Sequence, residues 1–282
     1  MHHFSTLSLI LLAAFVALSC NTAFAEQATE SQADELADFE ARVFDDGDGS
    51  TLPYRLLAPT EAEGPRPVLI FLHGAGERGD ENRRQLIHGK DLLLKAAQEF
   101  GCIVIAPQCP KGDKWSNVDW SQGTITFADA PSEPMRLTIA TLESLASEYD
   151  IDTNRIYIMG LSMGGYGSWD AVCRWPGRFA ATAPICGGGD PAKAPLLVDT
   201  PVWAFHGDED TVVSVDLTRA MVQAIKDAGG EPKYTEYPGV GHGSWVPAFA
   251  EPELLSWMTA QSLDREAAQS QPSTQPETQP ED

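Results

Sequence analysis

The sequence lacks an apolar run long enough to cross a bilayer, and it has little positive charge. Its longest apolar stretch, residues 7–18, has 12 residues, whereas a spanning helix needs about 20. Lysine and arginine together number 19 against 41 acidic residues, which gives a formal net charge of -22. Phosphate groups are repelled by such a charge, so the sequence argues against nucleic acid and anionic membrane surfaces as partners.

Cysteine is also scarce. Five cysteines occur in 282 residues, with neither a C-x-x-C pair nor a Cys/His spacing that would indicate zinc. We therefore expect no metal, and no cofactor is implied. Four cysteines follow residue 25: Cys102, Cys109, Cys173 and Cys186. The sequence leaves open whether they form disulfides or remain buried thiols, and it leaves the oligomeric state open too.

The first 25 residues are typical of a secretory signal peptide. Residues 7–18 have the length of its apolar region, and residues 23–25, Ala-Phe-Ala, have the small-x-small pattern of a cleavage site. A lipoprotein signal with the anchor on Cys20 is an alternative, although the residues before Cys20 fit the usual lipobox only loosely. We expect an exported protein, periplasmic or extracellular.

Composition divides the rest of the chain into three parts. Residues 26–39 are rich in acidic side chains and contain no lysine or arginine, which predicts a disordered leader. Residues 264–282 repeat glutamine and proline, which predicts a disordered tail. Residues 40–263 remain, a usual size for one domain.

Within residues 40–263, short apolar runs alternate with helix-length segments. The expected strands are 39–44, 54–58, 67–72, 102–106, 156–159, 180–185, 202–205 and 233–237. The expected helices are 86–100, 134–149, a segment after residue 163, 215–228 and 252–262. This alternation predicts an α/β fold of the α/β-hydrolase kind, with a mostly parallel central sheet and helices on both faces. The acidic turn between the first two strands fails the EF-hand pattern and is expected to be a plain turn.

A G-x-S-x-G motif at residues 160–164 joins one of these strands to the helix that follows it. The serine of such a motif occupies a sharp, strained turn, where glycines keep bulk away from crowded backbones. Ser162 is therefore a candidate nucleophile. The N–H of Met163, at the start of the helix, would face a developing negative charge. A glycine-rich turn without chemistry is the alternative.

A serine nucleophile needs a base, and the base needs an orienting carboxylate. His242 lies in a glycine-flanked loop after the last expected strand, and Asp210 follows the strand 202–205. The order Ser162, Asp210, His242 is the order that α/β-hydrolases use. Asp208 is the alternative acid.

Five motifs, at residues 73–79, 160–165, 184–190, 206–213 and 241–245, resemble those of serine-esterase α/β-hydrolases. The chain is similar to dienelactone-hydrolase-like and phospholipase/carboxylesterase proteins. It is closer to secreted bacterial predicted peptidases, feruloyl esterases and polyhydroxybutyrate-depolymerase-like proteins. The resemblance implies Asp210 as the acid, and an oxyanion hole formed by the N–H groups of Met163 and Ala75, with Gly76 as the alternative to Ala75. Dienelactone hydrolase itself uses a cysteine where this chain has Ser162.

The expected activity is hydrolysis of short-chain or aromatic esters, either small or linked to a polysaccharide. A peptidase of the prolyl-oligopeptidase type and a non-catalytic binding module are the alternatives. Trp115, Trp120 and Trp245 lie in expected loops near the site and would form a substrate wall, or else anchor those loops to the core. His73 and His206 are expected to shape loops, His88 to lie on a surface or a helix, and Glu77 and Arg78 to pair as a brace.

Overall fold

The computed structural model describes residues 36–59, 64–120 and 122–263. The expected signal peptide, the Cys20 anchor, the tail and most of the leader lie outside the described residues. The chain divides into two compact units, residues 1–40 and 41–282, and nearly all of the described residues belong to the second. No described helix combines the length and the apolar character that crossing a membrane requires.

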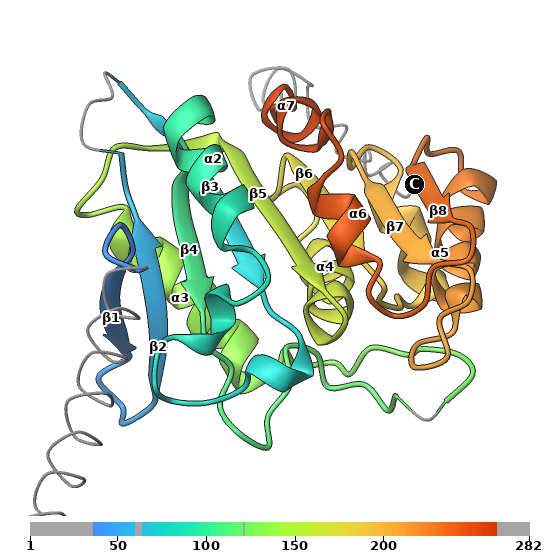
Figure 1. Cartoon of the computed structure of the whole chain (residues 1–282), viewed down its shortest axis with the longest axis horizontal. Coiled ribbons are helices and arrows are strands. Elements are labelled where there is room, and N and C mark those ends of the chain that lie inside the picture. The colour runs from blue at the N-terminus through green and yellow to red at the C-terminus, as the bar shows by residue number, and fades with distance from the viewer. Residues whose placement is uncertain (1–35, 60–63, 121, 264–282) are drawn as a thin grey trace, which may run out of the picture. The chain divides into compact units, whose positions relative to one another are not determined.

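An eight-stranded sheet forms the centre of this unit, in the order β1-β2-β4-β3-β5-β6-β7-β8 (Figure 1). Its strands are β1 Glu40–Asp45, β2 Thr51–Leu57, β3 Arg66–Leu72, β4 Ile103–Pro107, β5 Ile151–Leu161, β6 Ala181–Ile185, β7 Trp203–Gly207 and β8 Lys233–Tyr237. β2 pairs antiparallel with β4, and the pairs from β4 onward are parallel. The expected mostly parallel sheet is confirmed.

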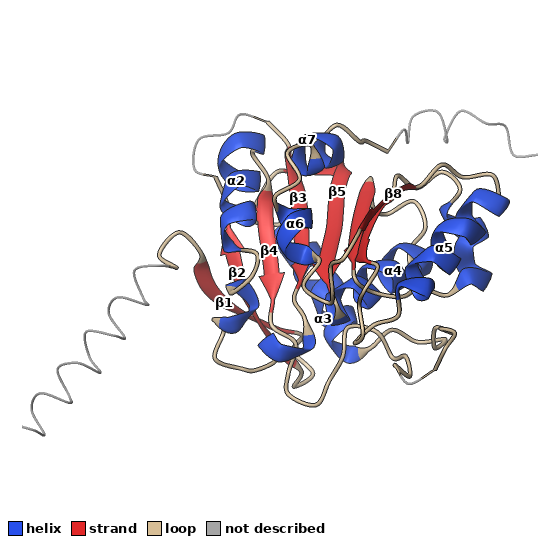
Figure 2. Cartoon of the chain, turned by 45° about the vertical axis from the view of Figure 1, so that its right-hand side comes forward, coloured by secondary structure: helices blue, strands red, loops and turns tan. Residues whose placement is uncertain are grey.

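Helices cover both faces of the sheet, as Figures 1 and 2 show. One face carries α2 Lys90–Phe100, α6 Trp245–Phe249 and α7 Leu254–Thr259, and the other carries α3 Glu133–Leu145, α4 Met163–Arg174 and α5 Val215–Asp227. Short 3-10 turns follow two strands: η1 Ala75–Glu77 and η2 Arg84–Leu86 come after β3, and η3 Pro191–Leu197 comes after β6. With both faces covered, central strands such as β3 are buried along nearly their whole length, which explains the continuous apolar run Val-Leu-Ile-Phe-Leu.

The register of the sheet places the candidate site residues beyond the carboxyl ends of the parallel strands. Leu72, the last residue of β3, pairs with Gly160 near the end of β5. Parallel strands in register have their carboxyl ends side by side, so the segments that follow β3 and β5 meet there. β7 and β8 are parallel as well, and Gly207 pairs with Tyr237. The loops after β3, β5, β7 and β8 therefore open on the same side of the sheet.

Two expected helices differ from the expectation: one is divided and one is shorter. The segment 86–100 splits into η2 and α2, and α2 begins after Gly89, where a Cβ atom would lie 2.6 Å from Cζ of Phe71. The segment 252–262 shortens to α7, and a separate helix, α6, begins at Trp245, where a loop was expected. The acidic turn is a plain turn, since Oδ1 of Asp46 accepts hydrogen bonds from the N–H groups of Asp48 and Ser50.

The four cysteines after residue 25 are free thiols in the structure, and all four are buried. Burial raises the pKa of Cys102, Cys109 and Cys186 to about 12. A buried thiol of such high pKa is seldom a thiolate at neutral pH. These residues therefore act as small apolar core side chains.

Candidate active site

Ser162 stands at the junction of β5 and α4 in a strained backbone conformation, with φ 53° and ψ −114°. Two glycines around it leave room for this turn. A Cβ atom on Gly160 would lie 2.5 Å from the carbonyl oxygen of Leu72, and one on Gly164 would lie 2.5 Å from the carbonyl carbon of the same residue. The Ser162 N–H donates to the Ile185 carbonyl at 2.9 Å. The expected strand, sharp turn and helix are all present.

His242 lies beside Ser162, with Nε2 2.9 Å from the serine Oγ. Its other ring nitrogen, Nδ1, lies 2.8 Å from Oδ2 of Asp210. A carboxylate oxygen only accepts, so in the neutral ring the hydrogen sits on Nδ1 and the lone pair on Nε2 faces the serine hydroxyl. The side chain of His242 is 21% exposed, enough to meet a molecule from solution.

Asp210 is held from several sides, and its side chain is fully buried. Oδ1 accepts hydrogen bonds from the N–H groups of Val212 at 2.8 Å and Val213 at 2.9 Å. Burial by itself raises the pKa of Asp210, but hydrogen bonds from His242, Val213 and Val212 outweigh burial and lower the pKa below its usual value. Asp208 instead accepts from the Gly239 N–H at 2.7 Å and shapes the loop, as expected of the aspartate that does not face His242.

The loop after β3 approaches Ser162 closely. A Cβ atom on Gly74 would lie 3.7 Å from Cβ of Ser162. Ala75 and Gly76 are the first two residues of η1, and Met163 is the first residue of α4, so their N–H groups have no acceptor within their own helices. These are the three backbone donors that the sequence indicated for an oxyanion hole.

Two buried side chains fix this loop. His73 is 1% exposed, its Nε2 accepts from the Cys109 N–H at 2.9 Å, and Nδ1 lies 2.6 Å from the Gly74 carbonyl. Burial lowers the pKa of His73 to about 4, so the ring is neutral near pH 7. Trp115 is fully buried, and its Nε1 donates to the His73 carbonyl at 2.9 Å. Trp115 therefore anchors the loop to the core and offers no surface to a substrate.

Other aromatic rings border the site. The Trp245 ring meets the His242 ring edge-on, with centroids 5.4 Å apart. Trp120 is 39% exposed and lies 6.2 Å, centroid to centroid, from Tyr166, which follows Ser162 by four residues in α4. Two of the three expected tryptophans thus lie where a bound molecule could touch them.

Sequence reasoning missed several neighbours of the site. His88 is exposed, as expected of a surface histidine, and its ring also lies 5.3 Å from that of Trp245, with Nε2 3.4 Å from Oε1 of Glu77. Arg78 donates to the carbonyls of Ala75 and Asp113, so the expected Glu77–Arg78 pair is replaced by two separate braces. A helical spacing of four from Ser162 could have indicated Tyr166, but nothing in the sequence indicated His88.

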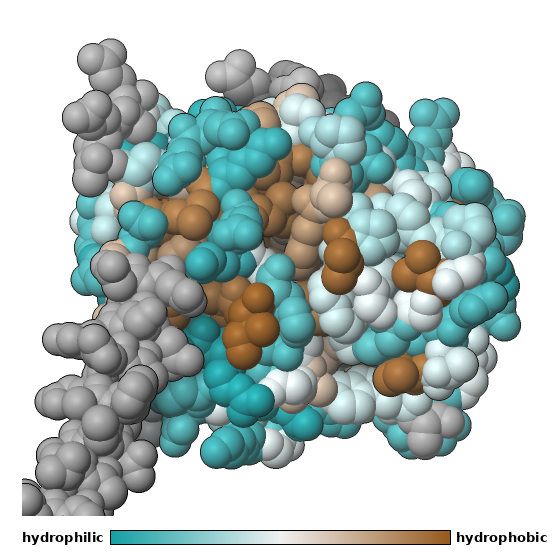
Figure 3. All heavy atoms as spheres, in the orientation of Figure 1, coloured by the Kyte–Doolittle hydropathy of each residue, from teal (hydrophilic) through white to brown (hydrophobic). Residues whose placement is uncertain are grey.

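Several exposed apolar side chains lie close in sequence to residues of the site. Among the described residues, six large hydrophobic side chains are exposed. Four of them are Trp120 itself or lie within two positions of a residue of the site or of its neighbour His88. The other three of these four are Ile87, Val212 and Val246. Figure 3 shows hydrophobic atoms in separate spots among hydrophilic ones on the face that carries α6 in Figure 1.

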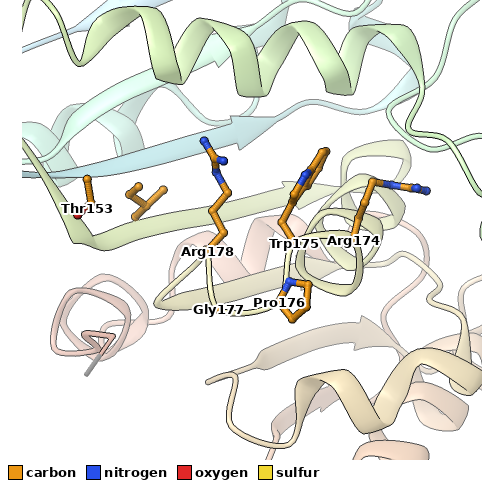
Figure 4. A pocket seen from close by; sticks show the side chains of 7 residues that line it. Thr153, Arg174, Trp175, Pro176, Gly177 and Arg178 are labelled. Carbon is orange, nitrogen blue, oxygen red and sulfur yellow. The ribbon is translucent and has the colours of Figure 1, made fainter. Parts of the chain in front are cut away.

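A different hollow, of about 520 Å³, lies at the far end of α4 (Figure 4). It is lined by Thr153 and Ile156 near the start of β5 and by the segment 174–178 at the end of α4. Ser162 stands at the opposite ends of both elements, and the 12 residues of α4 rise about 18 Å. The hollow therefore lies outside the candidate active site. The described residues contain no group of three or more His, Cys, Asp or Glu side chains that could hold a metal ion.

Residues 57–271 match the dienelactone hydrolase family. A solved structure of a thermostable esterase is 40% identical, with a TM-score of 0.74, and the match covers 80% of this chain and 64% of that one. Esterases and acylaminoacyl peptidases of lower identity share the fold, and that likeness shows the fold alone.

Two curated relatives are much longer proteins. The bifunctional acetylxylan esterase/xylanase of Neocallimastix patriciarum is 25% identical over 183 residues, which cover 64% of this chain and 24% of that protein. An uncharacterized secreted protein of Arthroderma benhamiae is 27% identical over 235 residues, 72% of this chain and 24% of that protein. The chain thus spans about a quarter of the length of each.

Proposed function

The chain belongs to the dienelactone hydrolase family, and from this premise we propose that it is a serine hydrolase that cleaves carboxylic esters. One observation carries the proposal: Oγ of Ser162 lies 2.9 Å from Nε2 of His242, whose Nδ1 lies 2.8 Å from the buried carboxylate of Asp210. A hydroxyl, an imidazole and a carboxylate in this order are the groups that acyl transfer to serine requires.

The first half of the reaction forms an acyl-enzyme. Ser162 Oγ attacks the ester carbonyl carbon while His242 Nε2 takes the hydroxyl proton, and Asp210 stabilises the resulting imidazolium. The N–H groups of Met163 and Ala75 stabilise the negative charge on the former carbonyl oxygen, with Gly76 as the alternative to Ala75. When the intermediate collapses, the bond to the alcohol oxygen breaks and His242 returns the proton to that oxygen.

The second half releases the acid. A water molecule gives a proton to Nε2 of His242 as its oxygen attacks the acyl carbon. The new tetrahedral intermediate collapses by breaking the bond to Ser162 Oγ, which recovers its hydrogen from His242. The products are a carboxylic acid and an alcohol, and no redox partner is needed.

Short-chain or aromatic acyl esters are the proposed substrates, either small or attached to a polysaccharide. The Trp245 ring contacts His242, and the Trp120 ring lies near Tyr166, one helical turn after Ser162; both offer an aromatic surface that suits a planar acyl group or a sugar ring. A relative named as an acetylxylan esterase supports the polysaccharide-linked class. The formal net charge of -22 favours neutral substrates over anionic ones.

The test is a rate series on p-nitrophenyl esters from acetate to decanoate, with a feruloyl ester and peptide p-nitroanilides beside them. We expect ester turnover with an initial burst, lost in Ser162→Ala and kept in the matched control Ser256→Ala, which changes an exposed serine of α7. Turnover of the anilides without turnover of the esters would indicate a peptidase and not an esterase. Inactivity of the wild type on every substrate would favour a binding module.

Export belongs to the same proposal. Residues 7–18 and the Ala-Phe-Ala at 23–25 support a signal peptide, and one relative is named as a secreted protein. Mass spectrometry of the protein expressed in its full length should find Glu26 at the mature N-terminus. A lipid-modified Cys20 at the N-terminus would point to the anchored form instead, and an intact Met1 would remove the export proposal.

A further inference from the structure

A second histidine, His206, contacts the carboxylate of Asp210. His206 is the fourth residue of β7, and its side chain is completely buried. The ring lies between Asp210, the Val213 carbonyl and the Thr218 hydroxyl of α5. It reaches no solvent, so any effect that it has on the chemistry passes through these partners.

Its Nε2 must carry a hydrogen atom. Nε2 lies 3.2 Å from Oδ2 of Asp210 and 3.0 Å from the carbonyl oxygen of Val213. Both atoms only accept hydrogen bonds, so an unprotonated Nε2 would face two other acceptors in a fully buried position. This position of the hydrogen follows from the contacts alone.

The other ring nitrogen faces a partner that can donate. Nδ1 lies 2.8 Å from Oγ1 of Thr218, whose one hydroxyl hydrogen can go either to Nδ1 or to the Gly187 carbonyl, also 2.8 Å from Oγ1. A hydroxyl can also accept, whereas both groups that face Nε2 only accept, so the single hydrogen of a neutral ring is assigned to Nε2, and the hydroxyl then donates to Nδ1. Burial lowers the pKa of His206, although Val213 and Asp210 act in the opposite direction. The ring is therefore neutral near pH 7, with its one hydrogen on Nε2 and aimed at Asp210 and Val213.

Asp210 then has a full set of donors. Two N–H groups, of Val212 and Val213, serve Oδ1, and two imidazoles, of His242 and His206, serve Oδ2. The side chain of Asp210 is 0% exposed, so water cannot replace a missing donor. Without His206, Oδ2 would have one hydrogen-bond partner, and rotation of the carboxylate away from His242 would meet less resistance.

We propose that His206 is a positioning residue: its Nε2–H holds Oδ2 of Asp210 in line with Nδ1 of His242. The inference rests on the proposed function, because it assigns to His206 a part in activating Ser162. His206 touches no substrate. It acts on the orientation of His242 through the one oxygen that the two histidines share.

Two substitutions at the same site separate this role from simple packing. A glutamine amide places its nitrogen near the position of Nε2, whereas an asparagine amide reaches only the position of Nδ1. We expect His206→Asn to lower kcat by roughly 10- to 100-fold, the effect of losing one hydrogen bond to a buried charge, with KM unchanged. His206→Gln should keep kcat within a few-fold of the wild type.

Two readouts need no natural substrate. The hydrogen on His242 Nδ1 should give a low-field proton resonance in protein with 15N-labelled histidine, present in the wild type and in His206→Gln and lost or shifted in His206→Asn. The rate at which a fluorophosphonate probe labels Ser162 should fall in His206→Asn alone. Should the wild type hydrolyse no ester, these two results still decide the role of His206, separately from the proposed function.

The proposal is overturned if His206→Asn keeps the resonance and the labelling rate of the wild type. It is equally overturned if the glutamine and asparagine variants lose both to the same extent, since that result assigns His206 to packing. If His206→Asn does not fold, Thr218→Val and Thr218→Ser decide. Loss of the hydroxyl that orients Nδ1 should slow labelling roughly threefold to tenfold in the valine variant, and the serine variant should match the wild type.

Discussion

The rings of His206 and His242 share one oxygen, Oδ2 of Asp210, at 3.2 Å and 2.8 Å respectively. The strand β7 supplies His206, and the loop after β8 supplies His242. Asp210 lies between them on the loop after β7. Asp208 has a different partner, because its side chain accepts a hydrogen bond from the Gly239 N–H.

The two aspartates provide the first prediction. Asp210→Asn should lower kcat about 10³- to 10⁴-fold, because an amide no longer fixes the His242 tautomer or stabilises the imidazolium. Asp208→Asn, two residues away, should keep kcat within a few-fold. Steady-state kinetics on the preferred ester, with circular dichroism as a check on folding, distinguish the pair. Equal losses in both variants would contradict the assignment of Asp210.

The turn at Ser162 provides the second prediction. Gly164→Ala should lower the free energy of unfolding by about 3 kcal/mol or more and abolish activity, since its Cβ would press on the backbone of Leu72. Gly123→Ala is the matched control, because a Cβ atom there meets nothing within 4 Å. Urea denaturation of both variants tests the difference, and a stable, active Gly164→Ala would refute it.

Substitution of Trp115 should affect the stability of the fold, whereas substitution of Trp120 should affect substrate binding. Trp115→Ala should lower the free energy of unfolding by about 3–5 kcal/mol, since it leaves a cavity and an unpaired His73 carbonyl. Trp120→Ala should leave the free energy of unfolding nearly unchanged and raise KM roughly threefold to tenfold for an aromatic ester. Thermal unfolding and KM, measured on both variants, check the division. A normal KM in Trp120→Ala would remove this ring from the substrate wall.

Stability should fall as the pH falls from about 6.5 to 4. An unfolded histidine titrates near pH 6.5. The pKa of His73 is lowered to about 4 by burial, so in this window the unfolded chain binds a proton that the folded chain does not. The resulting loss is up to about 3 kcal/mol for His73, and His206 acts in the same direction. Urea titrations at several pH values should show the decline, and His73→Gln should reduce it.

The pKa of Asp210 is lowered, so Asp210 affects the free energy of unfolding at a lower pH than His73 does. The stability that Asp210 adds is present above its unfolded value, near pH 4, and is lost only as the pH falls through its still lower folded value. The pH window of His73 and that of Asp210 therefore do not overlap. A free energy of unfolding that stayed constant between pH 6.5 and 4 would contradict the assignment to the buried histidines.

Local pattern was sufficient for most of the fold. The continuous apolar runs of β3 and β7 and the glycine pattern around Ser162 depend on neighbours in sequence, and the structure has strands and a sharp turn at those places. The parallel sheet follows from the alternation of strands and helices. The family resemblance supplied the preference for Asp210, since Asp208 also follows the end of the strand and spacing alone leaves it as a candidate.

Long-range contacts account for what the sequence did not predict. Trp115, Trp120 and Trp245 all lie in polar, loop-like surroundings, and only the tertiary structure buries the first and leaves the second 39% exposed. α6 is five residues long and contains a proline, a combination that helix periodicity does not detect. Similarly, His88 meets Trp245 across more than 150 positions of sequence, a contact that no local pattern encodes.

The place of β8 at an edge of the sheet has a consequence for the lifetime of the activity. β8 pairs with β7 on one side only, and the loop that follows it carries His242, whereas Ser162 follows β5 in the interior of the sheet. Edge elements open locally at lower free energy than the core. Warming should therefore separate His242 from Ser162 while most of the molecule is still native. Activity should then be lost at a lower temperature than the one at which the protein unfolds.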